Sequence, residues 1–168
     1  MTNAAQLPSL RVARLEASQA DPAADFLLRL WLESYAGRLP QSNVTQRTTS
    51  HFKDSLARRS GHCWLAWMGN RLVGLSTTVS NCLDDVWVHR KFRRRGIATR
   101  LIGVACGDLV KRGFRTAQVG CEDFNAAAIA LFESDGWRRV GSEPVDISPG
   151  VRHLALVYAR SLIREEVS

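Results

Sequence analysis

The sequence lacks a long hydrophobic run, and its first residues lack the features of a secretory signal. No apolar stretch approaches the roughly 18 residues that a membrane-spanning helix needs, so no transmembrane segment is expected. Residues 1–8 contain neither a basic region nor an apolar core of the kind found in signal peptides. The expected location is therefore the cytoplasm, without a membrane partner.

Cysteine is scarce, and its spacing argues against a metal site. The four cysteines stand 19, 24 and 15 positions apart, so none forms a Cys-x-x-Cys pair, and none has a histidine at helical ligand spacing. His62 and Cys63 are adjacent on an expected strand, where neighbours point to opposite faces. We expect no metal ion, and free buried thiols in a reducing compartment.

Lysine is also scarce, because only Lys53, Lys91 and Lys111 accompany the arginines among 23 basic residues. The net charge of +7 admits nucleic acid, anionic lipid or a polyanionic cofactor as a partner. Nucleic-acid-binding domains carry basic stripes interleaved with aromatic residues, whereas here the clearest basic cluster is confined to residues 90–95. A nucleic-acid-binding domain is thus the weakest hypothesis, and no nucleic-acid partner is expected.

A chain of 168 residues without linker, repeat or low-complexity segment is expected to form a single domain over 1–168, with its core at about 10–160. Hydrophobic periodicity and turn residues predict the order strand, two helices, three strands, helix, strand, helix, two strands. The strands are expected at about 10–15, 63–68, 72–79, 83–88, 116–121, 137–141 and 151–158, and the helices at about 21–36, 45–59, 97–112 and 126–135.

Short turns make the three central strands an antiparallel meander, while the crossover through 83–121 requires a parallel pair. A Pro-containing loop is expected at 143–150, between the last two strands. The predicted fold class is therefore α/β (α+β), with a mixed, mostly antiparallel sheet of about seven strands and helices on both faces.

The stretch from Val86 to Ala98 combines a strand, a basic turn and the start of a helix. Unpaired N–H groups at a helix N-terminus bind anions, and Gly96 lets the main chain approach a phosphate closely. Consecutive arginines add forked donors that match phosphate oxygens. The stretch predicts a pyrophosphate-binding turn; a solvated basic turn is the alternative.

Two segments together resemble the GCN5-related N-acetyltransferase (GNAT) family, whose enzymes move an acetyl group from acetyl-CoA to an amine. Residues 93–98, Arg-Arg-Arg-Gly-Ile-Ala, are similar to its pyrophosphate loop. Residues 125–137, from Asn125 to Trp137, resemble its second conserved segment, which begins with asparagine and ends with a Gly-aromatic pair. The resemblance extends over about residues 10–158, since the order of elements also agrees.

The resemblance implies a cofactor site around the basic turn and the second segment. Backbone N–H groups from Arg94 to Ala98 would hold the pyrophosphate, and Val88 would present backbone groups to the acetyl carbonyl and pantetheine. The residues implied in acetyl-CoA binding are Val86, Trp87, Val88, Arg93, Arg94, Arg95, Gly96, Ile97, Ala98, Thr99, Asn125 and Phe132. For Asn125, a helix N-cap is an equally good interpretation.

Phe132 departs from the family pattern, because many members have tyrosine there to protonate the departing thiolate. Phenylalanine cannot donate a proton, and a core aromatic is the simpler interpretation of this position. A thiol with a pKa near 8.5 leaves tolerably as the anion, and Tyr35, Tyr158 or water could replace the missing hydroxyl.

Amine acetylation also needs a base, since an alkylamine with a pKa near 10.4 is mostly protonated at neutral pH. The candidates are Glu122, Asp84 and Asp85, although each could instead be a solvated or capping carboxylate. Glu122 leads because it ends the strand after the crossover, where open sheets place their ligand crevice. Alternation along the strand puts Asp84 on the face of Val86, and Asp85 on the opposite face.

The acceptor pocket is expected to involve the first helix, especially Trp31 and Tyr35, which share a face at i, i+4, and the loop 37–40. Core packing explains this pair equally well. The leading functional hypothesis is direct acetyl transfer in a ternary complex to an amine of a small molecule or protein. A non-catalytic acetyl-CoA-binding module is the alternative, and dimers are common in the family, so a homodimer is also considered.

Overall fold

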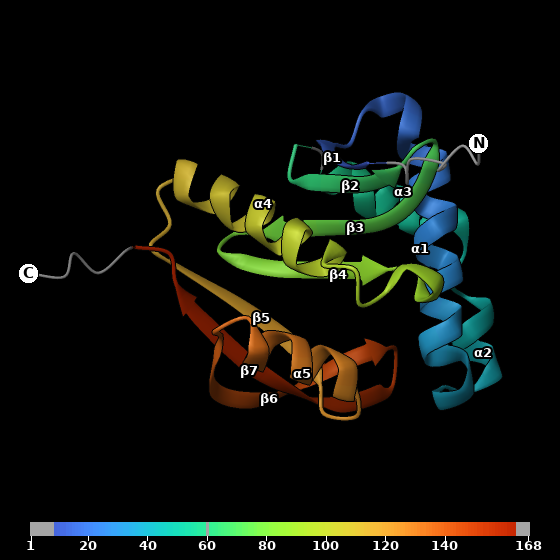
Figure 1. Cartoon of the computed structure of the whole chain (residues 1–168). Coiled ribbons are helices and arrows are strands. Elements are labelled where there is room, and N and C mark those ends of the chain that lie inside the picture. The colour runs from blue at the N-terminus through green and yellow to red at the C-terminus, as the bar shows by residue number, and fades with distance from the viewer. Residues whose placement is uncertain (1–8, 60, 164–168) are drawn as a thin grey trace, which may run out of the picture.

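The computed structural model describes residues 9–59 and 61–163, which form one seven-stranded mixed sheet in the order β1-β2-β3-β4-β5-β7-β6 (Figure 1). Every neighbouring pair is antiparallel except β4 and β5, which are parallel. The strands are β1 Leu10–Arg14, β2 Cys63–Met68, β3 Arg71–Val79, β4 Cys82–Val88, β5 Thr116–Glu122, β6 Arg138–Ser148 and β7 Val151–Ser161. The predicted fold class, including the parallel pair, is confirmed.

Helices cover both faces of the sheet, as predicted. Helices α4 and α5 pack on one face, where Leu101 and Phe132 join core residues of β2, β3, β4, β5 and β7. Helices α1 and α3 cover the other face, over Leu65 and Leu75. The helices are α1 Ala20–Tyr35, α2 Gln41–Thr45, α3 Thr49–Arg58, α4 Ile97–Lys111 and α5 Ala126–Ser134, with single 3-10 turns at Ala17–Gln19, Ala36–Arg38 and Arg90–Phe92.

The second predicted helix, at 45–59, corresponds to α3, which begins four residues later, and the short helix α2 before it was not predicted. Helix α2 ends at Thr45, and α3 begins after Thr48, whose hydroxyl accepts the backbone N–H of His51 as an N-cap. A threonine hydroxyl satisfies an otherwise unpaired N–H at a helix start, so this residue begins a helix rather than continuing one. The start of α1 also differs, because Ala20 precedes the expected cap Asp21.

The loop expected at 143–150 is mostly strand, because β6 and β7 form a long hairpin with its turn at 149–150. Pro144 pairs with Leu154 within this hairpin. Proline interrupts a central strand because it lacks an N–H, but β6 lies at the edge of the sheet, where one side needs no partner. The prediction of a loop was therefore wrong.

Strands β4 and β5 separate soon after they begin. Their pairing is limited to Cys82 with Gln118 and Leu83 with Val119, and Figure 1 shows the two strands diverging toward their carboxyl ends. Within the part of the chain that the structure describes, residues 85–88 of β4 therefore have strand partners only on the β3 side. Backbone groups on the other side of β4 are left available to a ligand.

Gly74 on β3 lets the start of α4 lie directly against the sheet. A Cβ at this position would lie 2.9 Å from Leu101 Cδ1, and 3.1 Å from both Ile97 Cγ2 and the carbonyl oxygen of Trp87. These contacts are too short for a methyl group, and one involves the backbone. The absence of a side chain at Gly74 thus sets the position of the helix that follows the basic turn.

Replacing Gly74 with alanine should lower the free energy of unfolding by about 1–3 kcal/mol, because the methyl group overpacks the contact between β3 and α4. Urea denaturation measures the change. Gly120→Ala on β5 is the matched control, since its Cβ would meet only Ala155 Cβ at an ordinary 3.7 Å. Equal unfolding midpoints for the two variants would contradict this packing account.

Candidate active site

The basic turn before α4 presents a row of backbone N–H groups. Gly96, with φ +75°, is the N-cap of α4, and Arg94 also has a positive φ, +59°. Among the described residues, no hydrogen-bond acceptor is found for the backbone N–H groups of 94–99. Alternating left-handed residues and an open helix N-terminus give the concave array of donors that anions bind.

Side chains around the turn anchor it on one side and leave it open on the other. Ile97 is buried in the core beneath α4, whereas Arg94, Arg95 and Thr99 are exposed. The Nε of Arg93 donates to the carbonyl oxygen of Val88 at 3.2 Å, which ties the turn to the end of β4. Gly96 has no side chain, and a Cβ placed there would have no neighbouring atom within 4 Å, so the surface beside the turn is open.

The end of β4 presents its side chains to both layers of helices. Val86 and Val88 pack in the core beneath α4, and Trp87 packs on the α1 side, against Tyr35. Because residues 86–88 precede the turn and border the gap between β4 and β5, the structure brings this predicted segment and the predicted anion site together.

Glu122 and Tyr35 meet at the end of β5, although 87 residues separate them. The hydroxyl of Tyr35 donates to Glu122 Oε1 at 2.5 Å. Burial raises the pKa of Tyr35, and the negative charge of Glu122 raises it further. Trp31 lies beside the pair, its ring centroid 5.5 Å from that of Tyr35, and both aromatic residues are buried. One residue of the predicted acceptor pocket, Tyr35, thus contacts the leading predicted base, and the other, Trp31, packs against Tyr35.

Asp84 and Asp85 are both engaged by other groups. Asp84 forms an ion pair with Arg59 on the α3 side of the sheet. Asp85 accepts hydrogen bonds at 2.9 Å from the hydroxyl of Thr77 and from the indole N–H of Trp87. Burial raises the pKa of Asp85, and the neighbouring Asp84 carboxylate raises it further. Glu122, by contrast, is the last residue of β5.

The expected opposite orientation of Asp84 and Asp85 was wrong. The register between β3 and β4 shifts at this point, so that Thr77 pairs with Asp85 while Thr78 pairs with Leu83, and Asp84 is the extra residue of a β-bulge. A bulge breaks the two-residue alternation of a strand. Asp84 therefore reaches Arg59 on the helix side opposite α4, rather than sharing the face of Val86.

Comparison with known proteins identifies the family of this chain. The model of the acetyltransferase (GNAT) family matches residues 24–137. This protein belongs to the GNAT acetyltransferase family. Membership confirms the predicted family, and with it the predicted class of enzyme, an acetyltransferase with acetyl-CoA as co-substrate. No curated protein sequence is significantly similar to the chain.

Solved GNAT structures share this fold at low sequence identity. PaiA N-acetyltransferase from Thermoplasma acidophilum, in complex with coenzyme A, has a TM-score of 0.69 and 13% identity, covering 91% of this chain and 99% of its own. YncA, a putative acetyltransferase from Salmonella typhimurium with acetyl-CoA, has a TM-score of 0.71 and 14% identity, covering 94% and 96%. The ribosomal-protein-S18-alanine N-acetyltransferase from Escherichia coli has a TM-score of 0.60 and 19% identity, covering 95% and 99%.

Within the second GNAT segment, Asn125 serves as the N-cap of α5. Its side-chain oxygen accepts the backbone N–H of Ala128 at 3.1 Å. The residue is exposed, and its side-chain amide still has two donors to offer. The helix-cap interpretation is thus realised, and a role toward the cofactor stays a prediction.

Phe132 lies in the core of this GNAT domain, 3% exposed, with its ring centroid 5.5 Å from Trp137 and 6.2 Å from Tyr158. Tyr35 and Tyr158 were the predicted substitutes for the missing tyrosine hydroxyl at position 132, and both of their hydroxyls are already hydrogen-bonded. Tyr158 donates to Glu133 at 3.0 Å, while Tyr35 donates to Glu122. Phe132 is therefore a core residue at the position of α5 where many members of the family have tyrosine.

Phe132→Tyr should fold normally and bind acetyl-CoA as tightly as the wild type, with increased thiol release, because the added hydroxyl supplies the missing proton donor. Thermal denaturation and steady-state thiol release measure the two parts. Phe114→Tyr, half-buried at the far end of α4, is the matched control. A large loss of acetyl-CoA affinity in the Phe132 variant alone would show that this helix packs unlike that of the family.

Sequence reasoning missed Phe124, which completes the aromatic surroundings of Tyr35. Their ring centroids lie 6.2 Å apart, and the guanidinium of Arg38 lies 4.1 Å above the Phe124 ring. His153 of β7 packs edge-on against the other side of Phe124, at 5.1 Å. The signal available in the sequence was proximity, since Phe124 follows Glu122 by two residues.

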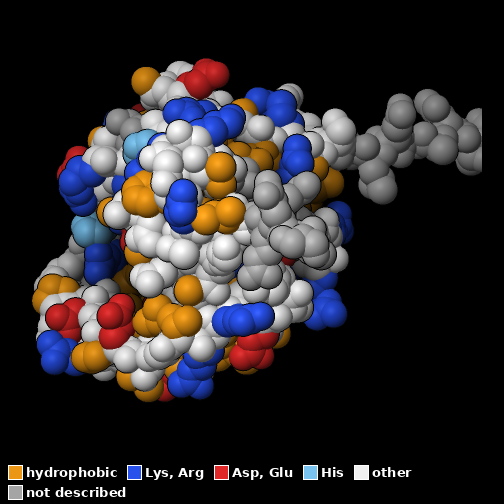
Figure 2. All heavy atoms as spheres, turned by 90° about the vertical axis from the view of Figure 1, so that its left-hand side faces the viewer, with side chains coloured by type: hydrophobic (Ala, Val, Ile, Leu, Met, Phe, Trp, Pro, Cys, Tyr) orange, Lys and Arg blue, Asp and Glu red, His pale blue; other side chains and the backbone are white. Residues whose placement is uncertain are grey.

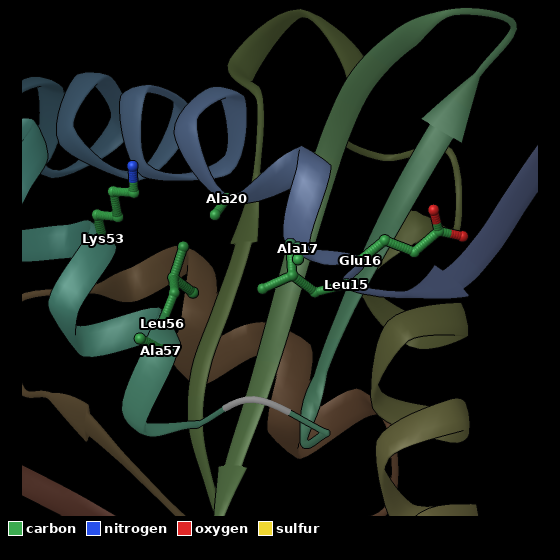
Figure 3. A pocket seen from close by; sticks show the side chains of 7 residues that line it. All are labelled: Leu15, Glu16, Ala17, Ala20, Lys53, Leu56 and Ala57. Carbon is green, nitrogen blue, oxygen red and sulfur yellow. The ribbon is translucent and has the colours of Figure 1, made fainter.

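Two surface hollows lie away from these residues. One, of about 300 Å³, lies between α3, the start of α1 and the segment before it, with Lys53 and Leu56 on one side and Leu15 on the other (Figure 3). The second, of about 330 Å³, lies by the β2–β3 turn. Within the described ranges, no three acidic, histidine or cysteine side chains form a metal site, and no helix is long and apolar enough to cross a membrane.

Basic side chains are dispersed on the face shown in Figure 2, where they alternate with acidic and apolar ones. This distribution differs from a continuous basic stripe for nucleic acid. The four cysteines are free thiols, and three of them, Cys63, Cys106 and Cys121, are buried.

Proposed function

We propose that this GNAT protein transfers the acetyl group of acetyl-CoA directly to an amine of a small molecule or protein, within a ternary complex. The observation that carries the proposal is the unpaired edge of β4, which leads straight into the donor-rich turn at Gly96. A thioester-bearing chain with a pyrophosphate needs this combination: an extended backbone to pair with and a helix N-terminus for its phosphates.

The residues of the turn fit the pyrophosphate. Backbone N–H groups of 94–99 point to no acceptor within the described chain, and Gly96 offers a surface without a side chain. The exposed guanidinium groups of Arg94 and Arg95 add positive charge beside them. Acetyl-CoA supplies a thioester whose C–S bond breaks as the acetyl group is transferred.

Glu122 is the proposed base, and Tyr35 holds it in place. The carboxylate accepts the proton that the amine loses as its nitrogen forms a bond to the acetyl carbon, while the sulfur leaves with the C–S electron pair. The Tyr35 hydroxyl fixes one oxygen of Glu122 at 2.5 Å and leaves the second oxygen for the proton. Val86 and Val88 offer backbone groups on the open side of β4 to orient the acetyl carbonyl.

The aromatic surroundings of Glu122 support an acceptor amine that enters from the α1 side. Trp31, Trp87 and Phe124 pack around the ring of Tyr35, whose hydroxyl is bonded to Glu122. Aromatic faces and a carboxylate together attract an ammonium group. Buried thiols are consistent with a reducing compartment, so we propose the cytoplasm as the location, with a homodimer as the assembly to test first.

A non-catalytic acetyl-CoA-binding module is the second candidate, favoured by Phe132 and by the engaged hydroxyls of Tyr35 and Tyr158. Thiol release from acetyl-CoA across a panel of polyamines, amino acids, aminoglycosides and peptides distinguishes the two. Amine-dependent release that Gly96→Glu abolishes supports the transferase. Saturable acetyl-CoA binding without release for any amine of the panel favours the binding module.

A further inference from the structure

The second hollow lies on the side of β4 away from β5. It has a volume of about 330 Å³ and is bordered by α1, by the β2–β3 turn and by the residue that follows β4. Polar contributors come from each of these elements: Arg29, Asn70, Arg71 and His89. In Figure 1 these elements meet beside the first half of α1. None of these residues belongs to the site described above.

The polar side chains of the hollow are mostly donors without partners. Neither Arg29 nor Arg71 makes a hydrogen bond or ion pair within the described residues. The one carboxylate of the lining, Asp25, already accepts the hydroxyl of Thr49 at 2.8 Å. Two guanidinium groups and one carboxylate thus border a concave surface, and neither guanidinium forms an ion pair with Asp25 or with another acid of the described residues.

His89 adds a third donor. Its Nδ1 accepts the backbone N–H of Lys91 at 3.2 Å, so in the neutral ring the proton lies on Nε2, away from that bond. Burial lowers the pKa of His89, and Arg71, Arg29 and Lys91 lower it further, while Glu33 acts in the opposite direction. A bound anion would offset this repulsion and restore the protonated ring.

We propose that this hollow binds a phosphate group, held by Arg29, Arg71 and His89. Arginine guanidinium groups match phosphate oxygens with paired donors. A site with two guanidinium groups and an imidazole therefore suits a phosphate dianion better than it suits a ligand with a single carboxylate. The apolar part of the lining, Phe26 and Leu72, provides a surface for the body of a phosphate ester. The site requires only these residues and not the transferase activity.

The hollow adjoins the basic turn through Phe92. The guanidinium groups of Arg71 and Arg95 lie 5.2 Å and 5.3 Å from the centroid of this ring, and His89 packs edge-on against it at 5.6 Å. The phosphate group therefore has two sources: a separate phosphate ester, or the 3′-phosphate of coenzyme A bound at the turn.

The test follows the His89 imidazole by NMR during titration of the full chain with inorganic phosphate. The resonances are assigned with His89→Asn. Saturable shifts are expected, together with a raised pKa of His89 at saturation. Arg71→Gln and Arg29→Gln should each weaken phosphate binding about tenfold or more. Arg138→Gln, an exposed arginine on β6, is the matched control and should leave binding unchanged.

Two further titrations identify the source of the phosphate. Shifts of His89 with coenzyme A but not with 3′-dephospho-coenzyme A assign the hollow to the cofactor's own phosphate; shifts with inorganic phosphate in the presence of either cofactor assign it to a separate ligand. Absence of saturable shifts with all three compounds, or equal affinity in Arg71→Gln and Arg138→Gln, overturns the site. Failure of coenzyme A to bind anywhere on the chain would instead contradict the proposed function. The titration with inorganic phosphate would still decide whether the hollow binds phosphate.

Discussion

Gly96→Glu is expected to abolish measurable acetyl-CoA binding in a chain that still folds. The new carboxylate would stand among the N–H groups proposed to hold the pyrophosphate, and like charges about 4 Å apart cost roughly 1–4 kcal/mol, or about a fivefold to thousandfold loss of affinity for each pair of charges. The side chain would also fill the surface that glycine leaves open. Isothermal titration with acetyl-CoA measures the loss.

Gly113→Glu is the matched control, because Gly113 follows the other end of α4 with a similar φ of +89° and equally open surroundings. Both variants pay the cost of a side chain in a left-handed conformation, about 1–2 kcal/mol, and both gain one negative charge. Only the Gly96 variant should lose binding. Unchanged acetyl-CoA affinity in folded Gly96→Glu would refute the assignment of the turn.

Glu122→Gln is expected to reduce amine-dependent thiol release about a hundredfold to ten-thousandfold, the range in which positioned bases contribute. The amide still accepts the hydroxyl of Tyr35 but cannot take a proton from the amine. The affinity for acetyl-CoA should stay unchanged, because Glu122 is on β5 and not in the turn at Gly96 that is proposed to hold the pyrophosphate. Steady-state kinetics over a range of pH, with an amine identified in the panel, measures both quantities.

Asp123→Asn, the exposed neighbour of Glu122, is the control and should keep wild-type turnover. Tyr35→Phe separates positioning from catalysis, because it removes the hydrogen bond to Glu122 but keeps the ring within its aromatic surroundings. A smaller loss of turnover is expected in Tyr35→Phe than in Glu122→Gln. If Glu122→Gln turned over like Asp123→Asn, another group would be the base.

The sequence was sufficient for the elements whose signals are local. Alternation and short turns predicted the β2–β3–β4 meander, and the crossover length required the parallel pair with β5. Two features depended on tertiary context. The bulge at Asp84 changed the side-chain alternation, and the position of β6 at the sheet edge allowed a strand through Pro144.

In the candidate site, too, the sequence predicted the local features and not the long-range contacts. The turn at Gly96 is continuous in sequence, so its composition indicates its chemistry. The pair of Tyr35 and Glu122 spans 87 residues, and periodicity contains no information on which side chains meet across such a distance. Each residue was named separately, but their hydrogen bond and the ring of Phe124 beside them emerge only from the folded chain.

The chemistry of the individual acids was also set by their surroundings. The sequence offered three carboxylates as candidates and favoured Glu122 by its position alone. In the fold, Arg59 neutralises Asp84, and Thr77 with Trp87 holds both oxygens of Asp85, whereas Glu122 has one oxygen bonded to Tyr35. Of the three candidates, Glu122 at the end of β5 is therefore the one with a carboxylate oxygen available to accept a proton.

Thermal denaturation of the wild-type chain with acetyl-CoA and, separately, with duplex DNA tests the central claim most directly. A ligand that binds the folded state at a hundred times its dissociation constant stabilises it by about 2.7 kcal/mol, which raises the unfolding temperature by several degrees. The proposed site predicts this rise with acetyl-CoA and none with DNA. Stabilisation by DNA without any by acetyl-CoA would contradict it.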